Sequence, residues 1–212
     1  MIDRQQVGFA AVGSLMSILF FMIVNFLTSP SEIWFIYPAF VLLFWPLSLA
    51  SVRKGYYRLY SVLGSLLVIV FLLTINYMKS PEFPWMVYAI FPFVWWPVTI
   101  WSGSKARTLT FAIFSSISTT VYYAILNAVM SPEYPWAIYP AFAVIWWPLA
   151  LYYVRKKQYY SFSISASALM IAFFITVNLV SSPDTIWAIY PIFAILWWPL
   201  SMYYFGVKRI KS

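Results

Sequence analysis

Long apolar segments with almost no charged side chains constrain this chain more than any other feature of its sequence. Each segment is about 20 residues long, the length of helix that crosses the roughly 30 Å hydrocarbon core of a bilayer. Of the 212 residues, 64% are hydrophobic and 8% are charged, too few charges to cover a water-exposed surface. Because lipid admits only helices or closed barrels, and because the segments do not alternate, they predict an all-α polytopic membrane protein. The eight predicted transmembrane helices span residues 7–28, 34–52, 59–79, 85–102, 108–130, 136–154, 161–181 and 186–205.

A pattern of polar, aromatic and proline residues recurs four times at an interval of 51 residues. The recurring positions are Asn25, Asn76, Asn127 and Asn178; Ser29, Ser80, Ser131 and Ser182; Pro30, Pro81, Pro132 and Pro183; Trp34, Trp85, Trp136 and Trp187; Tyr37, Tyr88, Tyr139 and Tyr190; Trp45, Trp96, Trp147 and Trp198; Pro46, Pro97, Pro148 and Pro199. These recurring positions indicate four internal repeats within a single membrane domain of residues 1–212. The repeats span residues 4–54, 55–105, 106–156 and 157–207. Each repeat holds two helices and returns the chain to the same side, so the four repeats are parallel. A pseudo-fourfold bundle and a simple stack both fit; the bundle is favoured because the first and last copies show no special capping.

Charged residues lie almost entirely between the apolar segments, and their sign differs between the two sides of the membrane. One side carries most of the basic residues: Arg4, Arg53, Lys54, Arg58, Lys105, Arg107, Arg155, Lys156, Lys157, Lys208, Arg209 and Lys211. The other side carries Lys79 and four of the five acidic residues. The positive-inside rule therefore predicts that both termini and the three basic loops are cytoplasmic. No small-residue cleavage site follows closely on the N-terminus, which predicts a first transmembrane helix rather than a removed signal peptide.

The segment Asn127-Ala-Val-Met-Ser-Pro-Glu-Tyr-Pro-Trp-Ala-Ile-Tyr-Pro140, followed by Trp146-Trp147-Pro148, resembles the bacterial two-transmembrane (2TM) domain family. That family has a similar Asn near the end of its first helix, a short turn with proline, a Trp, a Tyr-Pro or Trp-Pro step, and a later Trp. Laid on all four repeats, the resemblance implies a tandem array of such domains in the cytoplasmic membrane of a bacterium. Family members often stand beside histidine kinases or LytTR-type regulators, so the resemblance also implies a regulatory protein partner.

Each Ser-Pro step is followed by an acidic residue, and this arrangement has two interpretations. In the first, the Ser caps the next helix, the Pro occupies its first position, and the acid complements the helix dipole. In the second, four carboxylates form an outer ring that concentrates cations or holds a divalent ion. Capping is favoured because the first acid comes one residue later than the others. The candidate ring consists of Glu32, Glu82, Glu133 and Asp184.

The first helix of each repeat carries two small residues four apart, and an Asn that shares their face eleven residues further on. The polar residues of this candidate helix face are Ser14, Asn25, Ser65, Asn76, Ser116, Asn127, Ser167 and Asn178. One interpretation is helix packing, in which the odd-numbered helices meet near the centre and the aromatic even-numbered helices lie outside. The other is a polar line beside a conduction or binding cavity. Packing is favoured.

The remaining composition limits the classes of function. Catalysis inside the membrane needs a base, a nucleophile or a metal ion, and the predicted spans contain no Asp, Glu, His or Cys. We therefore expect no enzyme, no catalytic or metal-binding residue and no cofactor. The net charge of +8 comes from small juxtamembrane clusters, which suit anionic lipid headgroups and not nucleic acid. Two functions remain: a non-enzymatic multi-pass membrane module, such as a scaffold, sensor or envelope-stress component, and a channel or facilitator for a small solute or cation along the pseudo-fourfold axis.

The charge asymmetry makes a direct prediction about topology. A reporter enzyme that is active only in the cytoplasm, fused after Ser212, should be active, because the C-terminal basic cluster keeps that end inside. A fusion of a reporter that is active only outside the cytoplasm serves as the control and should be silent. Activity of the external reporter alone would contradict the eight-helix topology.

Overall fold

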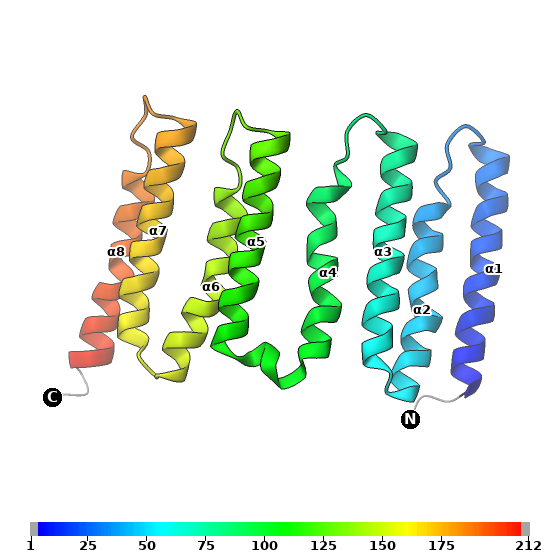
Figure 1. Ribbon diagram of the computed structural model, residues 1–212, viewed down its shortest axis with the longest axis horizontal. Helices are drawn as coiled ribbons and strands as arrows, with labels where there is room; N and C mark the ends of the chain where they lie inside the picture. The colour runs from blue at the N-terminus through cyan, green and yellow to red at the C-terminus, as the bar shows by residue number, and fades with distance from the viewer. Residues whose placement is uncertain (1–3, 209–212) are drawn as a thin grey trace. The chain divides into compact units, whose positions relative to one another are not determined.

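The structure, a computed structural model, describes residues 4–208, with the side chains of residues 52–54 and 207 outside the description. The described residues are 84% helical and contain no strand, which confirms the all-α prediction. Two short segments accompany the α-helices: a 3-10 segment, η1 (Gly103–Arg107), before α5, and a π-helical segment, η2 (Met202–Lys208), after α8. The α-helices in the described residues are α1 (Arg4–Thr28), α2 (Ile36–Lys54), α3 (Tyr57–Lys79), α4 (Met86–Ser102), α5 (Leu109–Met130), α6 (Ile138–Arg155), α7 (Tyr159–Ser181) and α8 (Ile189–Ser201) (Figure 1).

Several of these helices fit a membrane protein. Within residues 4–208, five helical segments are long and apolar enough to cross a membrane: α1, α3, Met86–Arg107 (α4 with η1), α5 and α7. The even-numbered helices begin one to three residues later than expected, because the residues after each Ser-Pro step form a turn instead of helix. Eight membrane crossings therefore stay a prediction. Of the basic residues on which the predicted topology rests, Arg209 and Lys211 and the side chains of Arg53 and Lys54 lie outside the described part of the chain.

The chain divides into two compact units, Met1–Gly103 and Ser104–Ser212, here called unit 1 and unit 2. In unit 1, α1 packs on α2, α2 on α3, and α3 on α4. In unit 2, α5 packs on α6, α6 on α7, and α7 on α8. Among the described residues, α1 does not contact α3, and α5 does not contact α7. The expectation that odd-numbered helices meet through their small faces is therefore wrong within each unit, because each small face packs against the even-numbered helix that follows it.

Stacked aromatic rings join the two helical hairpins of each unit. In unit 1, Phe40 of α2 stacks on Phe71 of α3, with ring centroids 4.0 Å apart and an interplanar angle of 13°. In unit 2, Phe142 of α6 stacks on Phe173 of α7 at 3.9 Å and 14°. Tightly stacked rings give the hairpins a defined mutual position through both their area and their geometry.

The turns that link α2 to α3 and α6 to α7 have the same backbone form. Gly55 and Lys157 both take positive φ angles, 68° and 54°. The next amide in each turn, that of Tyr56 or Gln158, donates to the carbonyl five residues earlier, at 3.0 and 3.1 Å. This is the bond that closes a helix C-terminus through a left-handed residue. Gly adopts this conformation freely, whereas Lys157 does so at a cost.

In unit 1, a tryptophan of each second helix lies beside a glycine of the first helix. At Gly64 in α3, an added Cβ would be 2.6 Å from Cη2 of Trp96, and Phe44 would be 3.5 Å away. The Trp96 ring also meets Tyr60 edge-on at 5.5 Å, so it has neighbours on more than one side. At Gly13 in α1, the corresponding Cβ would be 3.6 Å from Trp45, an ordinary contact.

This difference predicts opposite effects for one substitution at two positions. Gly13→Ala should raise the free energy of unfolding by about 0.5–1 kcal/mol, because Ala loses less backbone entropy in a helix than Gly. Gly64→Ala should lower it, because displacing the Trp96 ring costs about 1–3 kcal/mol and outweighs that gain. Thermal unfolding of both variants in detergent measures the difference. Equal or greater stability of Gly64→Ala would contradict the close packing of Trp96.

Candidate functional site

A buried Asn makes three hydrogen bonds in each of the turns between α1 and α2, α3 and α4, α5 and α6, and α7 and α8. These Ser-Pro turns comprise residues 29–35, 80–85, 131–137 and 182–188. In the first, Asn25 is 2% exposed and lies one turn before the end of α1. Its Nδ2 donates to the carbonyls of Ser29 and Glu32, at 2.9 and 2.7 Å. Its Oδ1 accepts from the backbone amide of Phe35 at 2.9 Å.

The same three bonds form in every Ser-Pro turn. Asn76 donates to Ser80 and Phe83 at 2.8 and 3.0 Å and accepts from Met86 at 3.0 Å. Asn127 donates to Ser131 and Tyr134 at 2.6 and 2.8 Å and accepts from Ala137 at 2.9 Å. Asn178 donates to Ser182 and Thr185 at 2.8 and 2.6 Å and accepts from Ala188 at 2.9 Å. Each amide therefore uses both of its N–H donors and its oxygen within its own hairpin.

These bonds replace the helix capping expected from the Ser-Pro sequence. Ser80, Ser131 and Ser182 are the C-cap residues of the helices that end there, not N-caps of the helices that follow. The N-cap residues of α4, α6 and α8 are Trp85, Ala137 and Ala188, none of which makes a side-chain capping bond. The start of each second helix instead receives its acceptor from the Asn of the first helix. The Ser-cap interpretation is therefore wrong.

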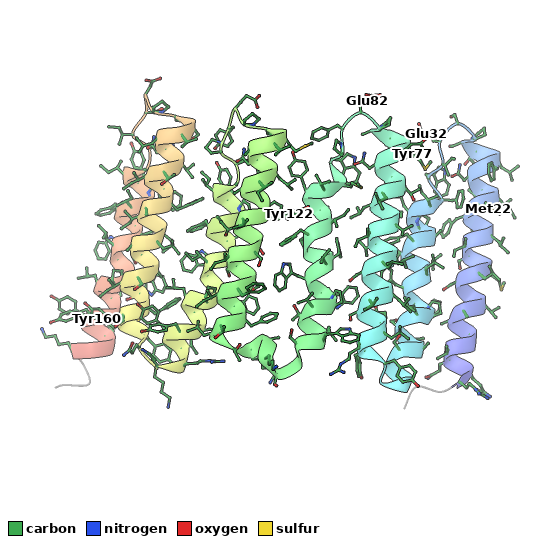
Figure 2. All side chains as sticks on the ribbon, in the orientation of Figure 1. Met22, Glu32, Tyr77, Glu82, Tyr122 and Tyr160 are labelled. Carbon is green, nitrogen blue, oxygen red and sulfur yellow. The ribbon has the colours of Figure 1, made fainter. Side chains whose placement is uncertain are left out.

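The four residues of the candidate acidic ring lie in the Ser-Pro turns, two in each unit. Glu32 and Glu82 lie at the same end of unit 1 (Figure 2). Glu32 forms an ion pair with Lys79, and both side chains are largely exposed, at 63% and 42%. Glu133 and Asp184 lie in the two turns of unit 2. Within residues 4–208, no group of three or more acidic, His or Cys residues is placed to hold a metal ion.

Tyr134 follows Glu133 in the third Ser-Pro turn. The hydroxyls of Tyr134 and Tyr139 are 2.6 Å apart and share a hydrogen bond. This bond raises the pKa of Tyr134 above its usual value. The phenol therefore stays neutral at physiological pH and adds no charge to the turn.

The four serines of the candidate helix face are buried, and two of them bond the second helix of their own hairpin. Ser14 donates to the carbonyl of Leu42, and Ser116 to that of Val144, each at 2.9 Å. The hydroxyls of Ser65 and Ser167 are buried without a hydrogen-bond partner among the described residues. Since α1 and α3 do not touch, and α5 and α7 do not touch, neither unit brings two of these serines together.

Sequence reasoning grouped Ser and Asn as one polar helix face, whereas the structure gives them separate tasks. The serines lie against the second helix, and the asparagines bind the turn. Each Asn accepts a hydrogen bond from the backbone amide ten residues later in the chain. This constant spacing is the signal in the sequence that indicates the cap. The residues that donate are Phe35, Met86, Ala137 and Ala188.

No family model, curated protein or solved structure matches the chain.

The hydrogen bonds of Asn127 predict the effect of an isosteric change. Asn127→Asp should lower the free energy of unfolding by about 2–4 kcal/mol at neutral pH, because two carbonyls lose their donors and face a carboxylate instead. Folding disfavours that carboxylate and so raises its pKa. The folded form is therefore relatively more stable below the carboxyl's unfolded pKa and loses stability as the pH rises.

Thermal unfolding of Asn127→Asp in detergent across a pH range measures this effect. Gln5→Glu makes the same chemical change at an exposed position of α1 and should have little effect. Equal stability of the two variants would show that the Asn127 bonds do not hold the turn.

Proposed function

We propose that this chain is a non-enzymatic, multi-pass module of a bacterial cytoplasmic membrane, with both termini in the cytoplasm. Eight transmembrane helices would form four parallel two-helix repeats, and the module would act as a scaffold, sensor or envelope-stress component. Five segments that are long and apolar enough to cross a membrane support the location. The resemblance to the 2TM domain family supports a tandem array that transmits a signal to, or anchors, a regulatory protein partner.

One observation carries this proposal: the buried polar groups of the hairpins bond mostly within the same hairpin. The four asparagines donate both of their side-chain N–H groups to carbonyls of the adjoining turns. Ser14 and Ser116 donate to carbonyls of the facing helix. A group that already has its partner is not available to replace the water around a moving ion or solute. This arrangement favours a structural module over a conducting one.

The charges of the Ser-Pro turns also weigh against the alternative, a channel or facilitator for a small solute or cation. A vestibule attracts cations through an excess of negative charge. In unit 1 the Glu32 carboxylate is paired with the Lys79 ammonium, which cancels one of the two negative charges there. The unpartnered hydroxyls of Ser65 and Ser167 are the features that favour the channel, and a flux experiment decides between the two functions.

We expect the purified chain in liposomes to give no cation flux above that of empty liposomes. The double variant Glu82→Gln with Glu133→Gln should give the same baseline, because these carboxylates then serve no conduction path. A fluorescent cation indicator inside the liposomes measures the flux, and an added ionophore verifies that the indicator responds. A cation flux in the wild type that the Gln pair abolishes would establish the channel instead.

The thermal stability of two variants in detergent tests whether close packing between the helices of a hairpin stabilises the fold. Ala10→Leu should lower the free energy of unfolding by about 1–3 kcal/mol, because Ala10 is 0% exposed against its neighbours. Ala11→Leu is the matched control on the exposed side of the same helix and should have little effect. Equal effects of the two changes would contradict close packing of the small face.

A further inference from the structure

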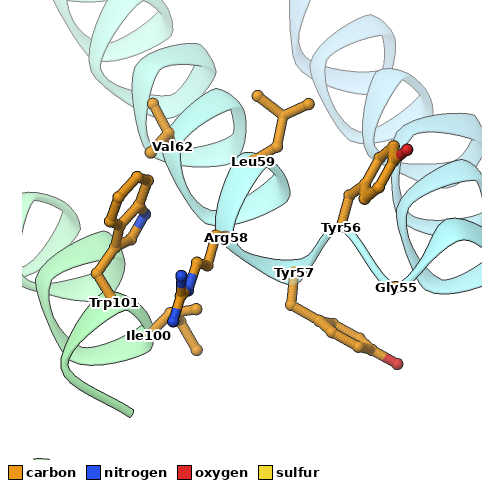
Figure 3. A pocket seen from close by; sticks show the side chains of 8 residues that line it. All are labelled: Gly55, Tyr56, Tyr57, Arg58, Leu59, Val62, Ile100 and Trp101. Carbon is orange, nitrogen blue, oxygen red and sulfur yellow. The ribbon is translucent and has the colours of Figure 1, made fainter.

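An open groove lies at the start of α3, beside the end of α4 (Figure 3). Its volume is about 790 Å³, and it lies at the end of unit 1 opposite to the Ser-Pro turns. Apolar side chains make up most of its surface, together with one cation and two phenols. The principal lining residues are Tyr56, Tyr57, Arg58, Leu59, Ile100 and Trp101.

Arg58 is the charged group of this groove. Its guanidinium lies over the ring of Trp101, 5.5 Å from the ring centroid, and Figure 3 shows the side chain extending toward α4. A cation–π contact of this kind holds the guanidinium at a fixed place on the wall of the groove. Its planar N–H groups form a fork that matches the oxygens of a phosphate.

Unit 2 has a groove at the corresponding residues, 102 positions further along the chain. It is smaller, about 310 Å³, and lies between the α6–α7 turn, the start of α7 and the segment after α8. A cation is again present, but as Lys157 in the turn, where unit 1 has Gly55. Its principal lining residues are Lys157, Gln158, Tyr159, Tyr160, Ser161 and Met202.

We propose that both grooves bind an anionic phospholipid, with the phosphate at Arg58 or Lys157 and an acyl chain along the apolar wall. This inference rests on the proposed function, because the orientation proposed there puts these grooves at the cytoplasmic leaflet. That leaflet carries anionic lipids and attracts juxtamembrane cations.

The composition of the grooves favours a lipid over a soluble phosphate compound. A soluble anion would gain nothing from the exposed apolar surface of Leu59, Val62 and Ile100, which are 53%, 38% and 37% exposed. A phospholipid can cover such surface with its acyl chain while its phosphate stays at the cation, which a soluble anion cannot do. Tyr and Trp rings that border a charged side chain are also typical of the depth at which lipid headgroups lie. The cation, the exposed apolar side chains and the bordering aromatic rings therefore all favour an anionic phospholipid as the ligand.

The test is the binding of phosphatidylglycerol to the purified full-length chain in a nonionic detergent, counted by native mass spectrometry. We expect two tightly bound phosphatidylglycerol molecules per wild-type chain and weaker binding of phosphatidylcholine. Arg58→Gln and Lys157→Gln should each remove one of the two, with affinity at the altered groove about tenfold lower, because a bond to a charged donor is lost. Together they should remove both.

Arg107→Gln is the matched control, because it removes the same charge from η1, outside both grooves. Thermal unfolding without added lipid verifies that each variant is folded. Equal loss of lipid in Arg107→Gln and Arg58→Gln would show general charge attraction and overturn the proposal. Displacement of the lipid by inorganic phosphate at equal concentration would overturn the lipid assignment in favour of a soluble anion. Because binding in micelles does not depend on orientation, this result is separate from the test of topology.

Discussion

A reversal of chain direction between two helices leaves helix ends with unpaired backbone groups, and each of the four Ser-Pro turns bonds three of these groups in the same way. A helix has four amides at its start and four carbonyls at its end without intrahelical partners, and such groups are costly where water is scarce. One Asn side chain bonds two carbonyls of the turn and one amide at the start of the next helix. The rest of each hairpin depends on this contact, because it sets where the second helix begins and which of its faces meets the first.

Once the Asn has set the start of the second helix, the small residues of the first helix decide how closely the two can pack. Ala10 and Ala112 are fully buried, and nearby Ser14 and Ser116 reach backbone carbonyls of the facing helix. Because apolar surface is equally well covered by lipid, close packing and hydrogen bonds, and not hydrophobicity, hold membrane helices together. Aromatic rings add two kinds of contact. In unit 1, tryptophans of the second helices lie beside glycines of the first helices, and in both units stacked phenylalanines join one hairpin to the next.

The helical class and the approximate helices followed from the sequence, because the length of an apolar run depends directly on bilayer thickness. The interval of 51 residues also located the residues that make the same bonds four times, Asn25 among them. What those residues do was harder to predict. Ser-Pro-acid is a helix-start signal in water-soluble proteins. The cap comes instead from another helix, because the backbone amide of Met86 donates to the side chain of Asn76. The partner of each small face was also missed, since spacing along one helix does not say which neighbour it meets.

The Asn bonds recur at the 51-residue interval of the sequence, but several other contacts recur at twice that interval. Ser14 and Ser116 have a carbonyl partner, whereas Ser65 and Ser167 do not. Position 10 and its counterpart 112 are Ala, while 61 and 163 are Ser, each of which bonds back to its own helix. Gly55 and Lys157, whose turns have the same backbone form, are also 102 residues apart, as are the two Phe stacks. Two unlike hairpins joined by a stack therefore form the structural period. A ligand or partner that binds to a feature of this longer period would find two similar sites per chain and not four. The two grooves lined by Arg58 and by Lys157 have this spacing.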